Sequence, residues 1–143
     1  MARRNEYDLI CIGSGPAGQR AAIQAAKLRK KAVVIEKQQC VGGVCIETGT
    51  IPSKTFREAI RRLYAQPHLD GTDADTHVPR LRPTMSHLLS HIGRVMQREI
   101  HIIRDALGRN DVDLVHGRAS FVDPHTVAEQ ATGAMVPATV ERL

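Results

Sequence analysis

The stretch YDLICIGSGPAG, from Tyr7 to Gly18, determines the fold that we expect for this 143-residue chain. Its first half, through residue 12, is a short apolar run, as in a strand buried on both faces of a parallel sheet. Its second half is a glycine-rich turn, after which a helical pattern runs from Pro16 to about Leu28. A second apolar run, residues 32–35, follows. We therefore predict a strand, a helix and a parallel strand, which together form a βαβ unit of α/β, Rossmann-like type.

The turn matches the pattern G-x-G-x-x-G, which is found where a dinucleotide binds. The three glycines allow a tight turn, a close approach of backbone to pyrophosphate, and close helix–strand packing. The helix that follows points free amide groups and its positive dipole end at the phosphates. The motif alone is a weak signal, but its place between a strand and a helix strengthens it. The candidate cofactor-binding residues are Gly13, Ser14, Gly15, Pro16, Ala17 and Gly18.

An acidic residue ends the second strand at the position that a ribose-binding carboxylate requires. Glu36 lies 18 residues after Gly18 and can accept hydrogen bonds from a ribose, while it would repel a 2′-phosphate. We include its neighbour Lys37 among the cofactor-binding candidates. The alternative is an ordinary glycine turn followed by a surface glutamate. The motif does not distinguish NAD from FAD, because the two share the adenosine-diphosphate half.

The remaining chain predicts two helices and several short strands. Gly42-Gly43 marks a sharp bend, and the apolar spacing beyond residue 84 is that of a long amphipathic helix. After Ala128 the periodicity ends, so residues 128–143 are expected to form an irregular tail. The expected elements are a helix from Pro52-Ser53 to about Tyr64, a loop over 65–83, a helix over 84–107, and strands at 113–116, 119–122 and 126–127.

Composition excludes several other classes of protein. The formal net charge is +5, but the basic residues are interleaved with acids, and with no Trp and only two Tyr and two Phe the chain offers few stacking platforms. We therefore expect no nucleic-acid partner. No apolar stretch approaches the roughly 20 residues of a membrane-spanning helix, and no signal peptide is evident. A soluble, cytoplasmic protein is the default expectation.

The segment VGGVCIETGTIPSK, from Val41 to Lys54, closely resembles a signature of the flavoprotein disulfide reductase superfamily. There the pattern is G-G-x-C-x-x-x-G-C-I-P-[ST]-K, after a glycine-rich nucleotide turn and an acidic strand end. The resemblance runs from Tyr7 to about Ala59 and returns more loosely over 113–127, which looks like the family's small sheet. It implies FAD as the cofactor and a homodimer for the full-length protein.

The chain departs from the signature at one of the two redox cysteines. The family's redox disulfide joins two cysteines five positions apart, and the matching residues here are Cys45 and Thr50. A threonine cannot form a disulfide, and this variation is similar to the FAD-containing pyridine nucleotide transhydrogenases. In those relatives hydride passes from NADPH to flavin and then to NAD, so that no dithiol is needed.

Cys40 also stands five positions before Cys45, but in register with the family it precedes the glycine bend, and we expect it to be an inert, buried thiol. Cys11, in a buried strand, is expected to pack in the core.

The resemblance also implies roles for single residues. Lys54 would lie beside the flavin N5, where its ammonium would stabilise negative charge on reduced flavin. The alternative is an exposed lysine in a first helical turn, where the helix dipole disfavours a cation. Ser53 is either a polar contact or a helix cap. The other cofactor-binding candidates in this segment are Gly42, Gly43, Cys45 and Thr50.

No metal site is expected. His87 and His91 share one helix face, but the sequence offers no third ligand at a suitable spacing, and a solvated pair is the simpler interpretation.

The chain contains one G-x-G-x-x-G, whereas the family fold has a second such unit for the nicotinamide nucleotide and a dimerisation domain. We therefore expect an incomplete domain, with residues 1–127 forming the amino-terminal part of a discontinuous FAD-binding domain, and little activity of this chain alone. Three alternatives stay open at this point: a non-catalytic nucleotide-binding fragment, a dihydrolipoamide-dehydrogenase-like disulfide reductase whose pair is lost or shifted to Cys40 and Cys45, and, last, a simple NAD-dependent dehydrogenase domain.

Overall fold

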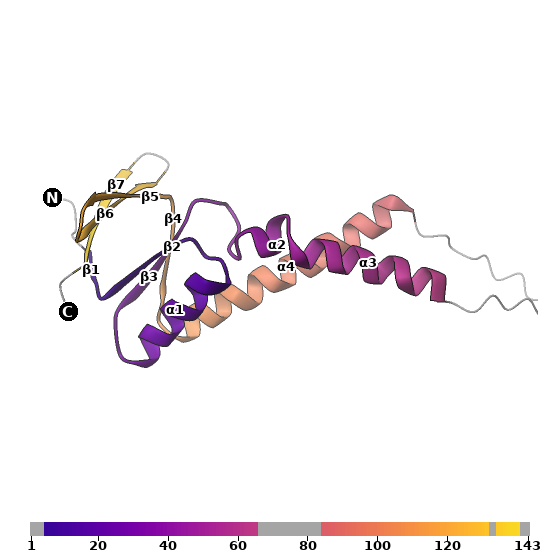
Figure 1. Ribbon diagram of the computed structural model, residues 1–143, viewed down its shortest axis with the longest axis horizontal. Coiled ribbons are helices and arrows are strands. Elements are labelled where there is room, and N and C mark those ends of the chain that lie inside the picture. The colour runs from indigo at the N-terminus through magenta and orange to yellow at the C-terminus, as the bar shows by residue number, and fades with distance from the viewer. Residues whose placement is uncertain (1–4, 66–83, 132–133, 141–143) are drawn as a thin grey trace, which may run out of the picture.

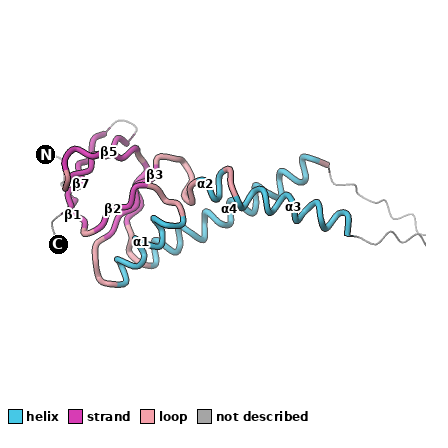
Figure 2. The backbone as a smooth tube through the Cα atoms, viewed as in Figure 1, coloured by secondary structure: helices cyan, strands magenta, loops and turns pink. Residues whose placement is uncertain are grey.

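A computed structural model describes residues 5–65, 84–131 and 134–140 and contains two sheets and a set of helices. The sheets lie at one end of the molecule, and two long helices, α3 and α4, extend from it as an arm (Figures 1 and 2). The elements in chain order are β1 (Asn5–Tyr7), β2 (Leu9–Ile12), α1 (Pro16–Lys27), β3 (Ala32–Glu36), α2 (Val44–Glu47), α3 (Thr50–Ala65), α4 (Met85–Arg109), β4 (Asp113–His116), β5 (Arg118–Asp123), β6 (Thr126–Ala131) and β7 (Ala134–Val140).

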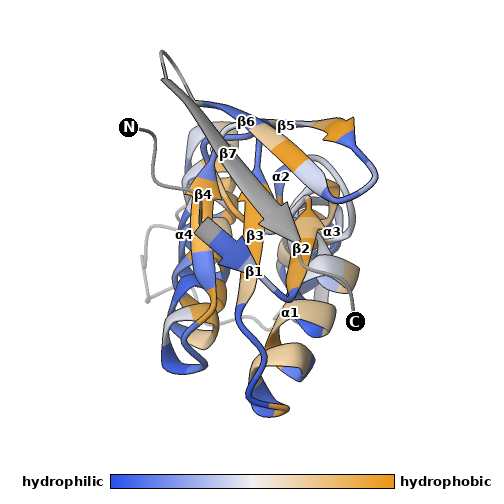
Figure 3. Ribbon diagram, turned by 90° about the vertical axis from the view of Figure 1, so that its left-hand side faces the viewer, coloured by the Kyte–Doolittle hydropathy of each residue, from blue (hydrophilic) through white to orange (hydrophobic). Residues whose placement is uncertain are grey.

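The predicted βαβ unit is confirmed. β2 pairs in parallel with β3, and β4 pairs in parallel with the other side of β3, which gives a three-stranded sheet in the order β2-β3-β4. All five residues of the central strand β3 are buried, and the three strands carry the strongly apolar residues that Figure 3 shows in orange. A fully buried aliphatic side chain contributes about 1.5–3 kcal/mol, so β3 is a main source of stability.

Helices α1 and α4 close one face of this sheet. The cluster that they share with the strands consists of small and aliphatic side chains, as the scarcity of aromatic residues requires. Ala22 of α1 is completely buried, so α1 approaches the strands closely. The buried residues of this cluster are Cys11, Ala22, Ala32, Val34, Leu107 and Val112.

The apolar run 7–12 was expected to be one strand, but it is divided between the two sheets. The break falls at Asp8, whose carboxylate accepts a hydrogen bond from the Lys31 amide at 2.7 Å. Tyr7 lies in β1, which pairs in parallel with β7, and its hydroxyl donates to Asp113 Oδ2 at 2.9 Å. Burial, together with this acidic partner, raises the pKa of Tyr7 to about 12. Tyr7 thus connects the second sheet to β4 of the parallel sheet.

The prediction of an irregular tail over 128–143 was wrong for the residues that the structure describes. β6 extends to Ala131, β7 covers residues 134–140, and the second sheet has the order β1-β7-β6-β5 with antiparallel pairing among β5, β6 and β7. The misleading signal was Glu129, a charged residue that is only 5% exposed. Pairing with neighbours on both sides outweighs its low strand propensity, because strand preference depends on context. The expected domain boundary at residue 127 stays a prediction.

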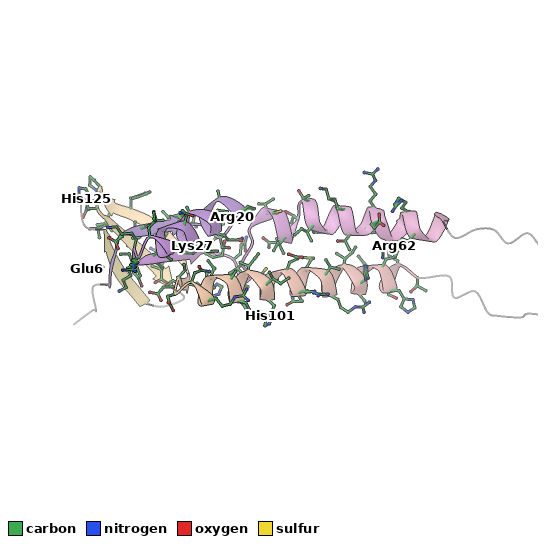
Figure 4. All side chains as sticks on the ribbon, turned by 90° about the horizontal axis from the view of Figure 1, so that it is seen from below. Glu6, Arg20, Lys27, Arg62, His101 and His125 are labelled. Atoms are coloured by element: carbon green, nitrogen blue, oxygen red, sulfur yellow. The ribbon has the colours of Figure 1, made fainter. Side chains whose placement is uncertain are left out.

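The helical arm begins earlier than predicted. α3 begins at Thr50 rather than at Pro52, and α4 is capped by Thr84, whose hydroxyl accepts from the His87 amide at 3.4 Å. Most of the predicted loop over 65–83 lies outside the described residues. Figure 4 shows Arg62 of α3 far from His125, which lies in the turn between β5 and β6, so the arm and the small sheet lie at opposite ends of the molecule. Among the described helices, none is both long and apolar enough to cross a membrane.

Candidate functional site: a dinucleotide cradle

The glycine-rich turn lies where β2 ends and α1 begins. Gly13 has φ +98°, a conformation that favours glycine, and its amide donates to the Ile35 carbonyl at 2.8 Å, which fixes the turn against β3. Gln19 of α1 donates from its side-chain amide to the Ser14 carbonyl at 2.6 Å. Gly15 is the residue before α1, Pro16 is the first helical residue, and Gly15 supplies no capping side chain. The first amides of α1 are therefore available to an anion, as a phosphate site requires.

Two glycines of the motif have visibly different surroundings. A Cβ atom placed on Gly18 would overlap the Gly13 carbonyl oxygen and lie 3.7 Å from Cys11 Cβ, so Gly18 allows α1 to pack closely on β2. A Cβ atom on Gly15 would meet no described atom within 4 Å, so the backbone of Gly15 borders open space. This open face, next to the amino end of a helix, fits a pyrophosphate that approaches the backbone.

Glu36 is the most strongly held side chain of the turn region. It is 4% exposed, and its Oε2 accepts from the Ser14 amide at 2.8 Å and from the Ser14 hydroxyl at 2.6 Å. Its Oε1 accepts from the Gln38 amide at 2.9 Å. Burial alone would raise the pKa of this carboxyl, but the hydrogen bonds from Ser14, Gln38 and Lys37 outweigh burial and lower the pKa below its usual value. Glu36 is therefore a buried anion, and the alternative of a surface glutamate is wrong.

A cavity of about 280 Å³ opens beside Glu36, at the carboxyl ends of β2 and β3. This is the edge at which open α/β sheets bind ligands. Lys37 lines the cavity, and so do Gly117, Arg118 and Ala119, which follow β4 and were not predicted as site residues. The strand at 113–116 was predicted, but it was assigned to the small sheet. Its parallel pairing with β3, which brings its carboxyl end to the same edge as Glu36, was not predicted. The complete lining is Ile12, Gly13, Ile35, Glu36, Lys37, Gly117, Arg118 and Ala119.

The glycine bend packs directly on the nucleotide turn. Gly43 has φ +61°, and a Cβ atom there would lie 3.2 Å from the Cα of Gly15. The Gly42 amide donates to the Ser14 hydroxyl at 2.9 Å, in a buried position. The structure therefore brings together two groups of predicted site residues that are separated by nearly thirty positions in the sequence.

The other predicted residues are placed differently. Cys45 lies in α2 and is half-buried, while Thr50 and Lys54 lie on α3 and are exposed. Lys54 borders a second hollow, of about 480 Å³, that is distinct from the cavity beside Glu36. Its lining comes from α3 and α4 and consists of Lys54, Thr55, Glu58, Ala59, Arg62 and His91. The structure does not place Lys54 and Glu36 in one cavity.

The early start of α3 changes two expectations. Lys54 is the fifth residue of the helix rather than part of its first turn, so the argument that the dipole disfavours a cation there loses its force. Ser53 does not cap the helix, because its hydroxyl donates backwards to the carbonyls of Gly49 at 2.9 Å and Thr50 at 3.2 Å. Such bonding is typical of a serine inside a helix.

All three cysteines are free thiols. Cys11 lies in the core as expected, and burial raises the pKa of its thiol. Cys40 is half-buried and packs beside the apolar cluster of Val41, Ile46 and Ile100. His87 and His91 are exposed, and the described part of the chain contains no group of three side chains suited to a metal.

Comparison with known proteins agrees with this geometry. The model of the family described as pyridine nucleotide-disulphide oxidoreductase matches residues 7–139. The chain belongs to this family. The predicted resemblance is thus confirmed, and with it an α/β fold of flavoprotein oxidoreductase type.

Several relatives are named soluble pyridine nucleotide transhydrogenase. The chain is 45% identical over 122 residues to that of Mycobacterium bovis (strain BCG / Pasteur 1173P2), a match that covers 85% of this chain and 26% of the relative. It is 37% identical over 139 residues to that of Vibrio cholerae (strain O395), which covers 94% of this chain and 29% of the relative. The chain therefore spans about a quarter of the length of these relatives.

Among solved structures, the HOCl-induced flavoprotein disulfide reductase RclA from Escherichia coli, as a Cu(II) complex, has a similar fold. The TM-score is 0.77 with 20% sequence identity, and the match covers 95% of this chain and 27% of the other. At this identity the likeness supports the fold alone.

Proposed function

We propose that this chain is the FAD-binding segment of an NAD(P) transhydrogenase, in which hydride passes from NADPH through flavin to NAD. The observation that carries the proposal is the cradle itself: a glycine turn with open space at Gly15, directly before an uncapped helix start, next to the buried carboxylate of Glu36. The transhydrogenase relatives and the Thr50 substitution in the redox signature support the reaction. On the same resemblance we propose a cytoplasmic homodimer for the whole protein.

In this proposal each part of the cradle has one task. The amides that follow Gly15 bind the pyrophosphate, and the dipole of α1 favours its negative charge. Glu36 accepts from the adenosine ribose, and the cavity bordered by Lys37, Gly117 and Ala119 holds the adenosine end. The close packing of Gly43 on Gly15 sets the direction in which the chain leaves the cradle towards Cys45 and Thr50.

The flavin supplies two-electron chemistry when it is bound, and the protein supplies position and charge. We assign Lys54 the catalytic role of placing a positive charge near the flavin N5. Gly42, Gly43, Cys45 and Thr50 complete the flavin-side contacts. The exposure of Lys54 on α3 leaves its ammonium free to approach a bound group.

The visible spectrum of the purified 143-residue chain, mixed with FAD and then desalted, tests the cofactor. We expect a retained yellow chromophore with flavin absorption. A colourless protein that binds ADP but not FAD would instead establish the non-catalytic nucleotide-binding alternative, and a protein that binds neither would overturn the cradle.

A thiol titration tests the reaction class. In a whole protein that carries this segment, NADPH should reduce the flavin under anaerobic conditions without producing a pair of new thiols. Two new thiols for each chain, lost in a Cys40→Ser variant, would show that a Cys40–Cys45 disulfide is the electron acceptor and that the protein is a disulfide reductase.

A further inference from the structure

Ser14 is the residue on which three segments of the cradle meet. Its side chain is completely buried, and its hydroxyl donates to Glu36 Oε2 at 2.6 Å while it accepts from the Gly42 amide at 2.9 Å. Its own amide donates to the same Glu36 oxygen at 2.8 Å, and its carbonyl accepts from Gln19 at 2.6 Å. Every polar group of Ser14 is therefore engaged within the protein.

These bonds limit what Glu36 can still accept. A carboxylate offers about four acceptor positions, two on each oxygen. Both positions of Oε2 are taken by Ser14, and one position of Oε1 is taken by the Gln38 amide. The Lys37 amide adds the smallest of the stabilising contributions to this carboxylate. At most one position therefore remains, on Oε1, and it belongs to a side chain that borders the cavity at the carboxyl ends of the strands.

We propose that Ser14 is a specificity-determining positioning residue, which occupies Glu36 Oε2 and so restricts Glu36 to a single hydroxyl of the adenosine ribose. The ribose of an adenosine nucleotide has two neighbouring hydroxyls, and a carboxylate with both oxygens free can accept from both. Here the second hydroxyl finds no free acceptor on Glu36. This inference rests on the proposed function, since it assumes that the cavity holds an adenosine nucleotide.

Ser14 also connects ribose recognition to the glycine bend. The hydroxyl that holds Glu36 is the one that receives the Gly42 amide, so a shift of the carboxylate also disturbs the position of residues 42 and 43. A small residue at position 14 would fill the same turn, but only a hydroxyl can donate to Glu36 and accept from Gly42 at the same time. Alanine would leave both the Gly42 amide and one position of Oε2 without a partner.

Calorimetric titration of the 143-residue chain with ADP, 2′-deoxy-ADP and 3′-deoxy-ADP tests the restriction. We expect one deoxy analogue to bind at least about tenfold more weakly than ADP, because a charge-assisted hydrogen bond is lost, and the other to bind within about twofold of ADP. In Ser14→Ala the freed position on Oε2 can accept from the second hydroxyl, so the difference between the analogues should shrink. Equal losses for both analogues in the unaltered chain would overturn the inference while leaving the nucleotide site intact.

A measurement without nucleotide tests Ser14 separately. Titration of the Glu36 carboxyl by carbon NMR should give a higher pKa in Ser14→Ala than in the parent, because the substitution removes the hydroxyl that donates to the anion and leaves only the amide of residue 14. Ser90→Ala, at an exposed position on α4, is the matched control and should change neither the pKa nor the analogue ratio. An unchanged Glu36 pKa in Ser14→Ala would overturn the positioning role. Failure of ADP itself to bind would instead overturn the proposed function, and with it the ribose restriction.

Discussion

The nucleotide cradle and the arm that carries Lys54 are built in opposite ways. In the cradle, Ser14 and Glu36 are buried and hydrogen-bonded, and Gly43 packs on Gly15. On the arm, Lys54 and Thr50 are exposed, and the hollow beside Lys54 is bordered by solvated side chains of α3 and α4. The cradle therefore holds its geometry through buried contacts within this segment, whereas Lys54 and Thr50 project from an exposed helix.

Charge distribution shows the same contrast. Hydrogen bonds from the Ser14 hydroxyl and from the Gln38 and Ser14 amides, with a smaller contribution from the Lys37 amide, keep Glu36 ionised; within the described residues its charge has no salt-bridge partner. On the arm, Glu58 is bonded to the guanidinium groups of Arg61 and Arg62, each at a distance of about 3 Å, and these lower the pKa of Glu58 to about 2. Ion pairs at such exposed positions contribute little to stability. Substitutions should therefore have larger effects in the cradle than on the arm.

The largest effect is expected for Gly15→Val. The side chain would enter the open space in which the pyrophosphate approaches, and FAD binding should weaken by at least about 100-fold, or about 2.7 kcal/mol. Because nothing described lies within 4 Å of that position, the variant should still fold. Flavin fluorescence titration measures the affinity, and circular dichroism checks the fold. Gly93→Val, at an uncrowded position on α4, is the control; a Gly15→Val variant that binds FAD like the parent would contradict the cradle.

Glu36→Gln should lower the free energy of unfolding by about 1–3 kcal/mol even without a ligand, since a buried network loses its charged acceptor. Urea unfolding at neutral pH measures this change. Lys37→Gln, at the exposed neighbouring position, is a matched control and should change stability by less than about 0.5 kcal/mol. Equal effects of the two substitutions would show that the hydrogen bonds of Glu36 have no energetic weight.

The same carboxylate predicts a pH dependence. Because the folded-state pKa of Glu36 is lowered, the stability that it contributes is complete above its unfolded pKa of about 4.3. That stability is lost as the pH falls through the lower, folded-state pKa. Unfolding free energies from about pH 6 down to about pH 3 should therefore decline more steeply for the parent than for Glu36→Gln. Parallel curves would contradict the assignment of the lowered pKa.

Gly18→Ala should destabilise the chain by about 1 kcal/mol. The new Cβ atom would overlap the Gly13 carbonyl, and overpacking of this kind costs about 1–3 kcal/mol, which a gain of about 1 kcal/mol in helix propensity partly offsets. Gly93→Ala has the same gain with no such overlap and should stabilise the chain. Thermal unfolding of both variants gives the comparison, and a stabilised Gly18→Ala would show that α1 is free to move away from β2.

The cradle could be predicted from sequence because its signals are local. Gly13, Gly15 and Gly18 stand at fixed offsets between an apolar run and a helical pattern, and these offsets correspond to distinct backbone requirements. The acidic end of β3 follows from the same unit. The division of residues 7–12 at Asp8 could not be predicted, since it depends on β7, more than 120 residues later. Glu129 concealed most of β6 for another reason: its charge breaks the apolar pattern, and its burial follows from pairing with β5 on one side and β7 on the other.

Residues of the site were missed where the signal was not local. Gly117, Arg118 and Ala119 reach the cavity because β4 is parallel to β3 and ends at the same edge of the sheet. Sequence analysis placed 113–116 with the small sheet, so the edge that they share with Glu36 was not recognised. The hydrogen bonds of Ser14 to Glu36 and Gly42 could not be predicted either, because they depend on side-chain positions that the spacing of residues in the sequence does not determine.

The smallest effect on the isolated chain is expected for Lys54→Ala. Lys54 is exposed, and it lies beyond the first turn of α3, where the helix dipole no longer opposes its charge. The free energy of unfolding should therefore change by no more than about 0.5 kcal/mol, as for most surface positions. If its ammonium acts on the flavin, the substitution should instead lower the reduction potential of FAD bound to a whole protein that carries this segment, because negative charge on the reduced ring loses a stabilising cation. Lys54→Arg keeps the charge and should retain the potential, whereas Lys27→Ala, on α1, serves as the surface control for charge loss. Denaturant unfolding together with a spectroelectrochemical titration separates the two effects. An unchanged potential with unchanged stability would remove Lys54 from the site and leave the cradle as the functional feature of this segment.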